Sequence, residues 1–159
     1  MSSLERIRRF AIPRPVILQT EEFLRIAGQY GHEGLALWCG AIEDERAVIK
    51  TVLIPAQQPV QSEDGICVVV GADALHDVNV FLYQNHLRLI AQVHSHGEHA
   101  YHSDTDNRFS IVTTLGALSI VVPFFASDGI VLANCAIFRL HNSGWYELEK
   151  AEKQALEVI

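Results

Sequence analysis

An apolar segment that leads straight into two histidines constrains this chain most. Residues 87–93 have the apolar character of a strand, and His94 and His96 follow directly. Side chains two apart on a strand point to the same face, so these imidazoles can aim at one point. A divalent metal requires this arrangement of its first two protein ligands. The segment therefore predicts a buried strand that ends in half of a metal site.

The third ligand stays open at this level, because Asp106, His102 and His99 all follow closely. Two histidines, one carboxylate and a fourth position for water form a catalytic zinc pattern, whereas structural zinc sites have four protein ligands. The residues alone therefore predict a metal-dependent hydrolase.

Length and charge exclude several other classes of protein. With 159 residues and 49% hydrophobic residues, we expect a single domain over residues 1–159 with a sizeable core. The net charge of −7 argues against a nucleic-acid-binding surface. No apolar run reaches the roughly 18 residues of a membrane span, and no signal peptide is recognisable. Cys39, Cys67 and Cys135 form no close pair, which favours buried thiols and a cytoplasmic location.

Hydrophobic periodicity predicts an α/β or α+β domain, with a mixed sheet flanked by helices. Thr20 is expected to cap a first helix that ends near Gly31, with Phe23, Ile26, Ala27 and Tyr30 as its apolar stripe. A second helix is expected over residues 73–87, and a third from Ser103 to Gly116. A polar loop is expected over residues 55–65 and a helical tail over 148–158. Strands are expected over residues 34–42, 47–54, 66–70, 87–93, 117–122, 130–140 and 145–148.

Four separated features together resemble one known family. Glu33 precedes a glycine-containing apolar strand, His94-Ser95-His96 ends a later strand, and Ser103-x-x-Asp106 begins a predicted helix. Their order is similar to that of the JAMM (MPN-type) metallopeptidases in their short prokaryotic form. Gly97 stands where the family pattern has proline. The resemblance implies a JAMM/MPN-like fold, a cytidine-deaminase-like sandwich.

The same resemblance implies a role for each residue of the motif. His94, His96 and Asp106 would hold one Zn²⁺ per chain, zinc-bound water would be the nucleophile, Glu33 would be its general base, and Ser103 would stabilise the oxyanion. The implied activity is that of a deubiquitinase-like isopeptidase or peptidase. It would cleave after the C-terminal tail of a ubiquitin-like protein, by deconjugation or by precursor processing. The implied partners are that protein or its conjugates and the associated activating and conjugating enzymes, with no nucleic acid and no membrane.

Simpler or competing interpretations exist for these residues. Ser103-x-x-Asp106 is also a helix-capping signature, and Glu33 alone would be a solvated carboxylate. His94, His96 and His99 together approximate the ligand motif of metallo-β-lactamase-type hydrolases. A non-catalytic MPN-like scaffold is the third alternative. Within the family, release of an amino acid from a sulfur-carrier protein is a further expected reaction.

Overall fold

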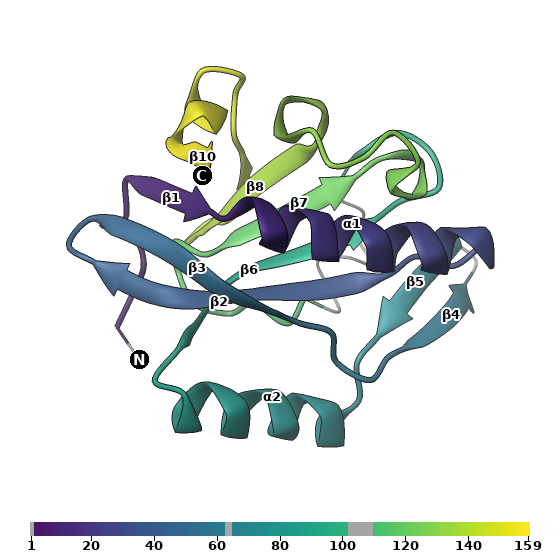
Figure 1. Ribbon diagram of the computed structural model, residues 1–159, viewed down its shortest axis with the longest axis horizontal. Helices are drawn as coiled ribbons and strands as arrows, with labels where there is room; N and C mark the ends of the chain where they lie inside the picture. Colours follow the sequence, from purple (N-terminus) through teal and green to yellow (C-terminus); the bar gives the residue numbers. More distant parts are fainter. Residues whose placement is uncertain (1, 63–64, 102–109) are drawn as a thin grey trace.

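The computed structural model describes residues 2–62, 65–101 and 110–159 (Figure 1). Its regular elements, in chain order, are β1 (Arg9–Ile12), α1 (Arg14–Gln29), β2 (Leu35–Glu43), β3 (Arg46–Leu53), β4 (Gln58–Ser62), β5 (Gly65–Val69), α2 (Ala72–Gln84), β6 (Arg88–Ser95), β7 (Leu118–Val122), β8 (Ala136–His141), β9 (Gly144–Glu147) and β10 (Leu156–Val158). Three short 3₁₀ turns, η1 (Phe124–Ala126), η2 (Leu132–Asn134) and η3 (Glu152–Ala155), join the later strands.

One mixed sheet dominates the described part of the molecule. Its 8 strands lie in the order β10-β1-β3-β2-β6-β7-β8-β9. β1 runs parallel to β10 and to β3, and β6 runs parallel to β7, whereas the other neighbours are antiparallel. β4 and β5 form a separate antiparallel hairpin. The predicted mixed sheet with flanking helices is confirmed, and the fold class is α+β.

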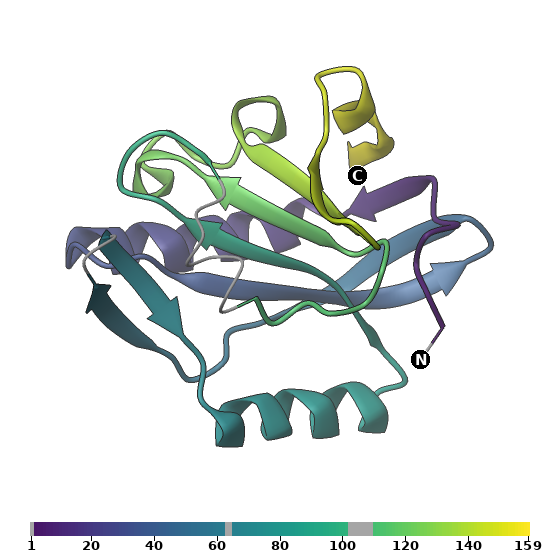
Figure 2. The same cartoon turned by 180° about the vertical axis from the view of Figure 1, so that it is seen from behind.

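The two helices cover opposite faces of this sheet (Figures 1 and 2). Alternate side chains of β2 point to opposite faces, as the pleat of a strand requires. The indole of Trp38 faces α1 and donates to Thr20 Oγ1 at 2.9 Å. The opposite face carries a smaller cluster shared with α2, formed by Leu37, Cys39, Val78 and Leu82. β2 and its neighbour β6 are thereby buried from both sides.

The first helix begins earlier than the sequence predicts. Its first residue is Arg14, with Pro13 before it and Pro15 in its first turn, where the missing proline N–H removes no helical hydrogen bond. Thr20 is therefore inside α1, and its predicted role as a cap is wrong.

The buried stripe of α1 also differs from the prediction. Ile26 and Tyr30 are exposed, because the helix turns another side toward the sheet. The buried residues of α1 are Val16, Ile17, Thr20 and Leu24.

Three further predictions of secondary structure are corrected. The expected loop 55–65 contains β4, which pairs with β5. The expected helical tail 148–158 contains η3 and β10, because pairing of Leu156 with Phe10 buries it in the sheet edge. The expected helix 103–116 is absent over 110–116, where the side chain of Gln92 accepts the backbone N–H groups that a helix would use.

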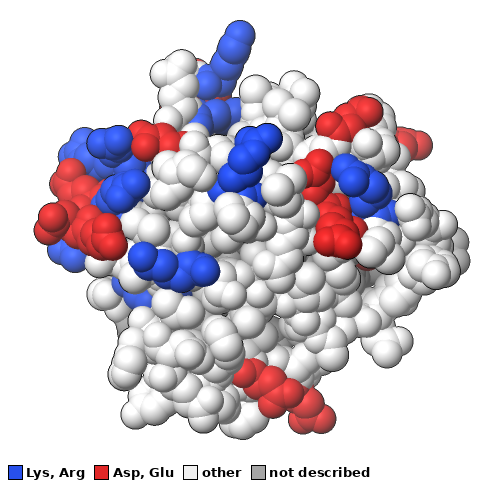
Figure 3. All heavy atoms as spheres, in the orientation of Figure 1, with Lys and Arg blue, Asp and Glu red and all other residues white. Residues whose placement is uncertain are grey.

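Charged side chains gather at the rim of the face seen in Figure 3, and the surface between α1 and α2 carries few of them. Near the β2–β3 turn both signs occur together, with Arg8 3.2 Å from Glu45 and Arg46 3.7 Å from Glu43. In the described ranges, neither α1 nor α2 has the length and apolar character needed to cross a membrane.

Candidate metal centre

His94 and His96 lie together where β6 ends. His94 pairs with Leu35 of β2 and with Val121 of β7, so neighbours on both sides hold its backbone. The N–H of His96, just beyond the strand, donates to the carbonyl of Val122 at 2.9 Å. Both imidazoles are buried, and their Nε2 atoms are 3.3 Å apart. The predicted convergence of the two rings is confirmed.

The spacing of these nitrogens fits a tetrahedral metal. Two zinc–nitrogen bonds of about 2.0–2.1 Å, meeting at about the tetrahedral angle, separate their nitrogens by about 3.3–3.4 Å. Burial excludes competing water from the rings, and imidazole nitrogen is a preferred zinc donor. The pair therefore has the donor chemistry and the separation of two zinc ligands.

The predicted ligand Asp106, the predicted oxyanion group Ser103 and His102 lie outside the described residues. Described residues on both sides of this segment contact His96 or its strand, β6. The ring of Tyr101 packs edge-on against His96, with 4.7 Å between centroids. The backbone N–H groups of residues 111 and 112 donate to Gln92 Oε1 at 3.0 and 3.1 Å. Gln92 lies two residues before His94 and therefore on the same face of β6.

Glu33 lies at the same end of the sheet, at the start of the adjoining strand. Gly34 exchanges two hydrogen bonds with Ser95, the residue between the two histidines. Its N–H donates to Ser95 Oγ at 3.0 Å, and its carbonyl accepts the Ser95 N–H at 3.1 Å. Glu33 is half-buried and one residue from this contact. The contact between Gly34 and Ser95 thus places the backbone of Glu33 close to the segment that carries the two histidines.

His99 does not join the pair. Its side chain is exposed and lies against Tyr101, with 5.2 Å between ring centroids. Across the described ranges, no three His, Cys, Asp or Glu side chains gather in a way that could hold a metal ion. The triad His94, His96 and His99 required by the metallo-β-lactamase alternative is therefore not assembled.

Phe125 supports the turn after His96, a role that sequence reasoning missed. Its N–H donates to the His96 carbonyl at 2.8 Å, with φ at 53° in the left-handed region. A Cβ at Gly97 would lie 2.8 Å from its ring, and a Cβ at Gly28 of α1 would lie 2.4 Å from its own Cβ. Glycine at both positions lets Phe125 pack between the helix and the metal-site turn. The neighbouring Phe124 is exposed.

Gln57 was also missed, because no spacing pattern marks it. Its Oε1 accepts the N–H of Leu35 at 2.8 Å, and its Nε2 donates to the Leu35 carbonyl at 2.9 Å. Leu35 is the residue that pairs with His94. Only the three-dimensional arrangement shows this contact beside the site.

Among the described residues, none of the three cysteines gathers with the histidine pair. All are buried and free of disulfides. Burial raises the pKa of the Cys39 and Cys135 thiols to about 12 in each case, so they remain protonated at neutral pH. Metal binding needs the thiolate. The prediction that these thiols act as small buried side chains is confirmed.

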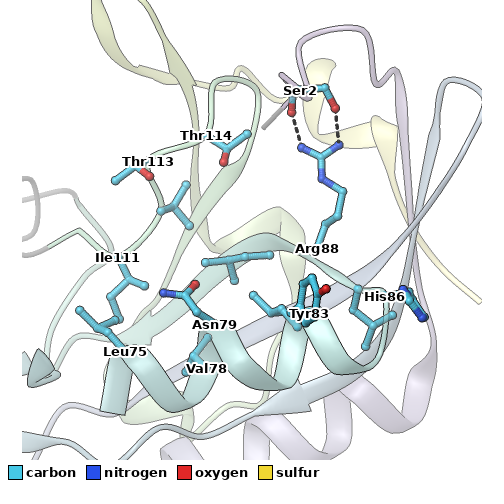
Figure 4. A pocket seen from close by; sticks show the side chains of 14 residues that line it. Ser2, Leu75, Val78, Asn79, Tyr83, His86, Arg88, Ile111, Thr113 and Thr114 are labelled. Atoms are coloured by element: carbon cyan, nitrogen blue, oxygen red, sulfur yellow. Dashed lines mark hydrogen bonds between the residues drawn. The ribbon is translucent and has the colours of Figure 1, made fainter. Parts of the chain in front are cut away.

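A separate groove of about 820 Å³ lies at the other end of β6, between α2 and residues 111–114 (Figure 4). Its lining is mostly apolar. At one end, the guanidinium of Arg88 donates to the carbonyl and the hydroxyl of Ser2. Burial and the nearby Arg6 lower the pKa of Arg88. The groove is lined by the first residues of β6, whereas His94 lies near the end of this strand and His96 just beyond it.

Comparisons with known proteins bear on the fold and on the family of the chain. No model of a known protein family matches the chain. The solution structure of protein DSY2949 from Desulfitobacterium hafniense shares the fold, with a TM-score of 0.65, 15% identity and coverage of 94% of this chain and 92% of that one. The probable metalloprotease y4jG of Sinorhizobium fredii (strain NBRC 101917 / NGR234) is 45% identical over 152 residues, which span 95% of this chain and 94% of that protein. At this identity and coverage, the chain belongs to the family of the probable metalloprotease y4jG.

Proposed function

We propose that the chain is a zinc-dependent isopeptidase or peptidase of the JAMM type. In this proposal it cleaves after the C-terminal tail of a ubiquitin-like protein, in the cytoplasm. The observation that carries the proposal is the buried pair of imidazoles with Nε2 atoms 3.3 Å apart, beside the start of β2. The family relationship to a probable metalloprotease supports a peptide-bond substrate. The order of Glu33, His94-Ser95-His96 and Ser103-x-x-Asp106 supports the JAMM type.

The proposed ligand set is His94, His96 and Asp106, with one zinc ion per chain. Anchoring of the flanking residues to His96 and Gln92 supports Asp106 as the third ligand. Bound zinc would supply Lewis acidity and lower the pKa of a water molecule to roughly 7.

Glu33 is the proposed general base, and Ser103 the proposed oxyanion donor. A carboxylate beside the metal can accept the proton of the attacking water and deliver it to the leaving amine. Half-burial of Glu33 and the fixed backbone of Gly34 suit this role. The partly exposed ring of Tyr101 packs against His96 and suits contact with an extended peptide tail. A ubiquitin-like protein presents such a tail.

The test is cleavage of a ubiquitin-like protein, encoded near the gene of this chain, fused at its C-terminus to a reporter. Glu33→Gln keeps the size of the side chain but removes the base. We expect it to retain zinc and to lose about 10²–10⁴ in turnover. The matched control is Glu22→Gln, the same change at an exposed position of α1, which should cleave like the wild type.

Three outcomes would contradict the proposal. Equal turnover by the wild type and Glu33→Gln would remove Glu33 from the reaction. Failure of the zinc-loaded wild type to cleave any ubiquitin-like or sulfur-carrier fusion would favour the non-catalytic scaffold. Cleavage that survives removal of zinc by a chelator would exclude metal dependence.

A further inference from the structure

The β3 edge of β2 is incomplete next to the metal site. β3 ends at Leu53, which pairs with Leu37, so its ladder does not reach Leu35. The side chain of Gln57 takes the place of a strand there. It accepts the Leu35 N–H at 2.8 Å and donates to the Leu35 carbonyl at 2.9 Å and to the Pro55 carbonyl at 2.9 Å. A carboxamide offers the same donor and acceptor as a peptide group.

The other edge of the same segment is held by β6. Gly34 makes its two hydrogen bonds with Ser95 at 3.0 and 3.1 Å. Two consecutive residues are therefore hydrogen-bonded on opposite edges of the segment, Gly34 to Ser95 and Leu35 to Gln57. Both ties lie within two residues of Glu33.

We infer that Gln57 is a positioning residue for Glu33. The inference rests on the proposed function, in which Glu33 is the general base. Proton transfer requires the base to be held within about 0.5 Å of its productive position, and a displacement of about 1 Å can cost 10²-fold in rate. Gln57 supplies that constraint by completing the sheet edge at Leu35.

Gln57 also joins the β4–β5 hairpin to the site. It directly precedes Gln58, the first residue of β4. A displacement of the hairpin is therefore transmitted to the Leu35 backbone through the side chain of Gln57. The position of Glu33 is thereby coupled to the hairpin as well as to β6.

The test compares Gln57→Met with Gln58→Met. Methionine keeps the length of glutamine but makes none of the three hydrogen bonds. The side chain of Gln58 is exposed, so its replacement is the matched control. With the ubiquitin-like fusion as substrate, we expect Gln57→Met to lower kcat by up to about 10²-fold with KM little changed. Zinc content should stay at the wild-type level, and the Leu35 amide should exchange faster with solvent.

A double-mutant cycle separates positioning from a loss of folded protein. Less folded protein would lower turnover by the same factor in every background. A residue that acts through Glu33 should instead cause little further loss in Glu33→Gln. An equal factor in both backgrounds, or wild-type kcat in Gln57→Met, would overturn the inference.

The two proposals fail in different ways. If Glu33→Gln cleaves like the wild type, the proposed general base is wrong, and the role of Gln57 falls with it. If Glu33→Gln is impaired while Gln57→Met matches Gln58→Met, only the positioning role is wrong.

Discussion

At the scale of single residues, the side chains of His94 and His96 form the metal-binding half of this site. Their Nε2 atoms, 3.3 Å apart and buried, leave room for one shared ion. We expect His94→Ala and His96→Ala each to lose zinc, because each removes one donor. His99→Ala should retain it, because His99 lies against Tyr101 on the surface. Metal analysis after dialysis checks this.

Retention of zinc after both strand histidines are replaced would show that the ligands lie elsewhere. Loss of zinc in His99→Ala alone would restore the metallo-β-lactamase alternative, which the geometry disfavours.

The histidine pair could be predicted from sequence because it depends on local geometry alone. Residues two apart on a strand share a face whatever the rest of the chain does. Gln57 and Phe125 could not be predicted in this way. Gln57 contacts a backbone 22 residues away, and Phe125 lies between a helix and a turn that the sequence does not place side by side.

At the scale of whole elements, Thr20 joins the helix α1 to the sheet. Its hydroxyl donates to the Val16 carbonyl at 2.8 Å and accepts the indole N–H of Trp38 at 2.9 Å. Thr20→Val keeps the shape but leaves this buried indole N–H without its acceptor. We expect a loss of about 1–3 kcal/mol in the free energy of unfolding, measured by urea denaturation.

Thr20→Ser is the control for this prediction. It keeps the hydroxyl and removes a methyl group, worth about 0.8 kcal/mol when buried. A Thr20→Val protein as stable as the wild type, or more stable than Thr20→Ser, would show that the indole does not depend on this hydroxyl.

Several elements could be predicted because their pattern matches their final environment. The antiparallel pair β2 and β3, the helix α2 and the strand β6 all have the apolar periodicity of their buried faces. β10 could not, because it is only three residues long and is held by parallel pairing with β1, far away in sequence. The start of α1 could not be predicted either, because the threonine that looks like a cap bonds to Val16 within the helix and to Trp38 of the sheet.

The whole molecule depends on contacts between its distant parts, and Arg139 of β8 makes several of them. Its guanidinium donates to the carbonyl of Gly116 at 3.0 Å, and to those of Leu4 at 2.9 Å and Ile7 at 2.7 Å. It also lies over the ring of Phe10, 5.4 Å from the centroid. Burial lowers the pKa of Arg139, and the nearby Glu5 opposes this shift. One side chain thus fastens the N-terminal segment to the sheet.

Replacing Arg139 should therefore destabilise the whole fold. Arg139→Met keeps most of the aliphatic stem but leaves several carbonyls without their donor, and we expect a loss of about 2–4 kcal/mol in the free energy of unfolding. Arg8→Met makes the same chemical change at an exposed ion pair with Glu45, which is worth at most about 1 kcal/mol. Denaturant titration of both variants measures the difference. Equal losses in the two would show that the N-terminal segment is held by its apolar contacts, with Leu4 and Ile7 in the core, and not by the guanidinium.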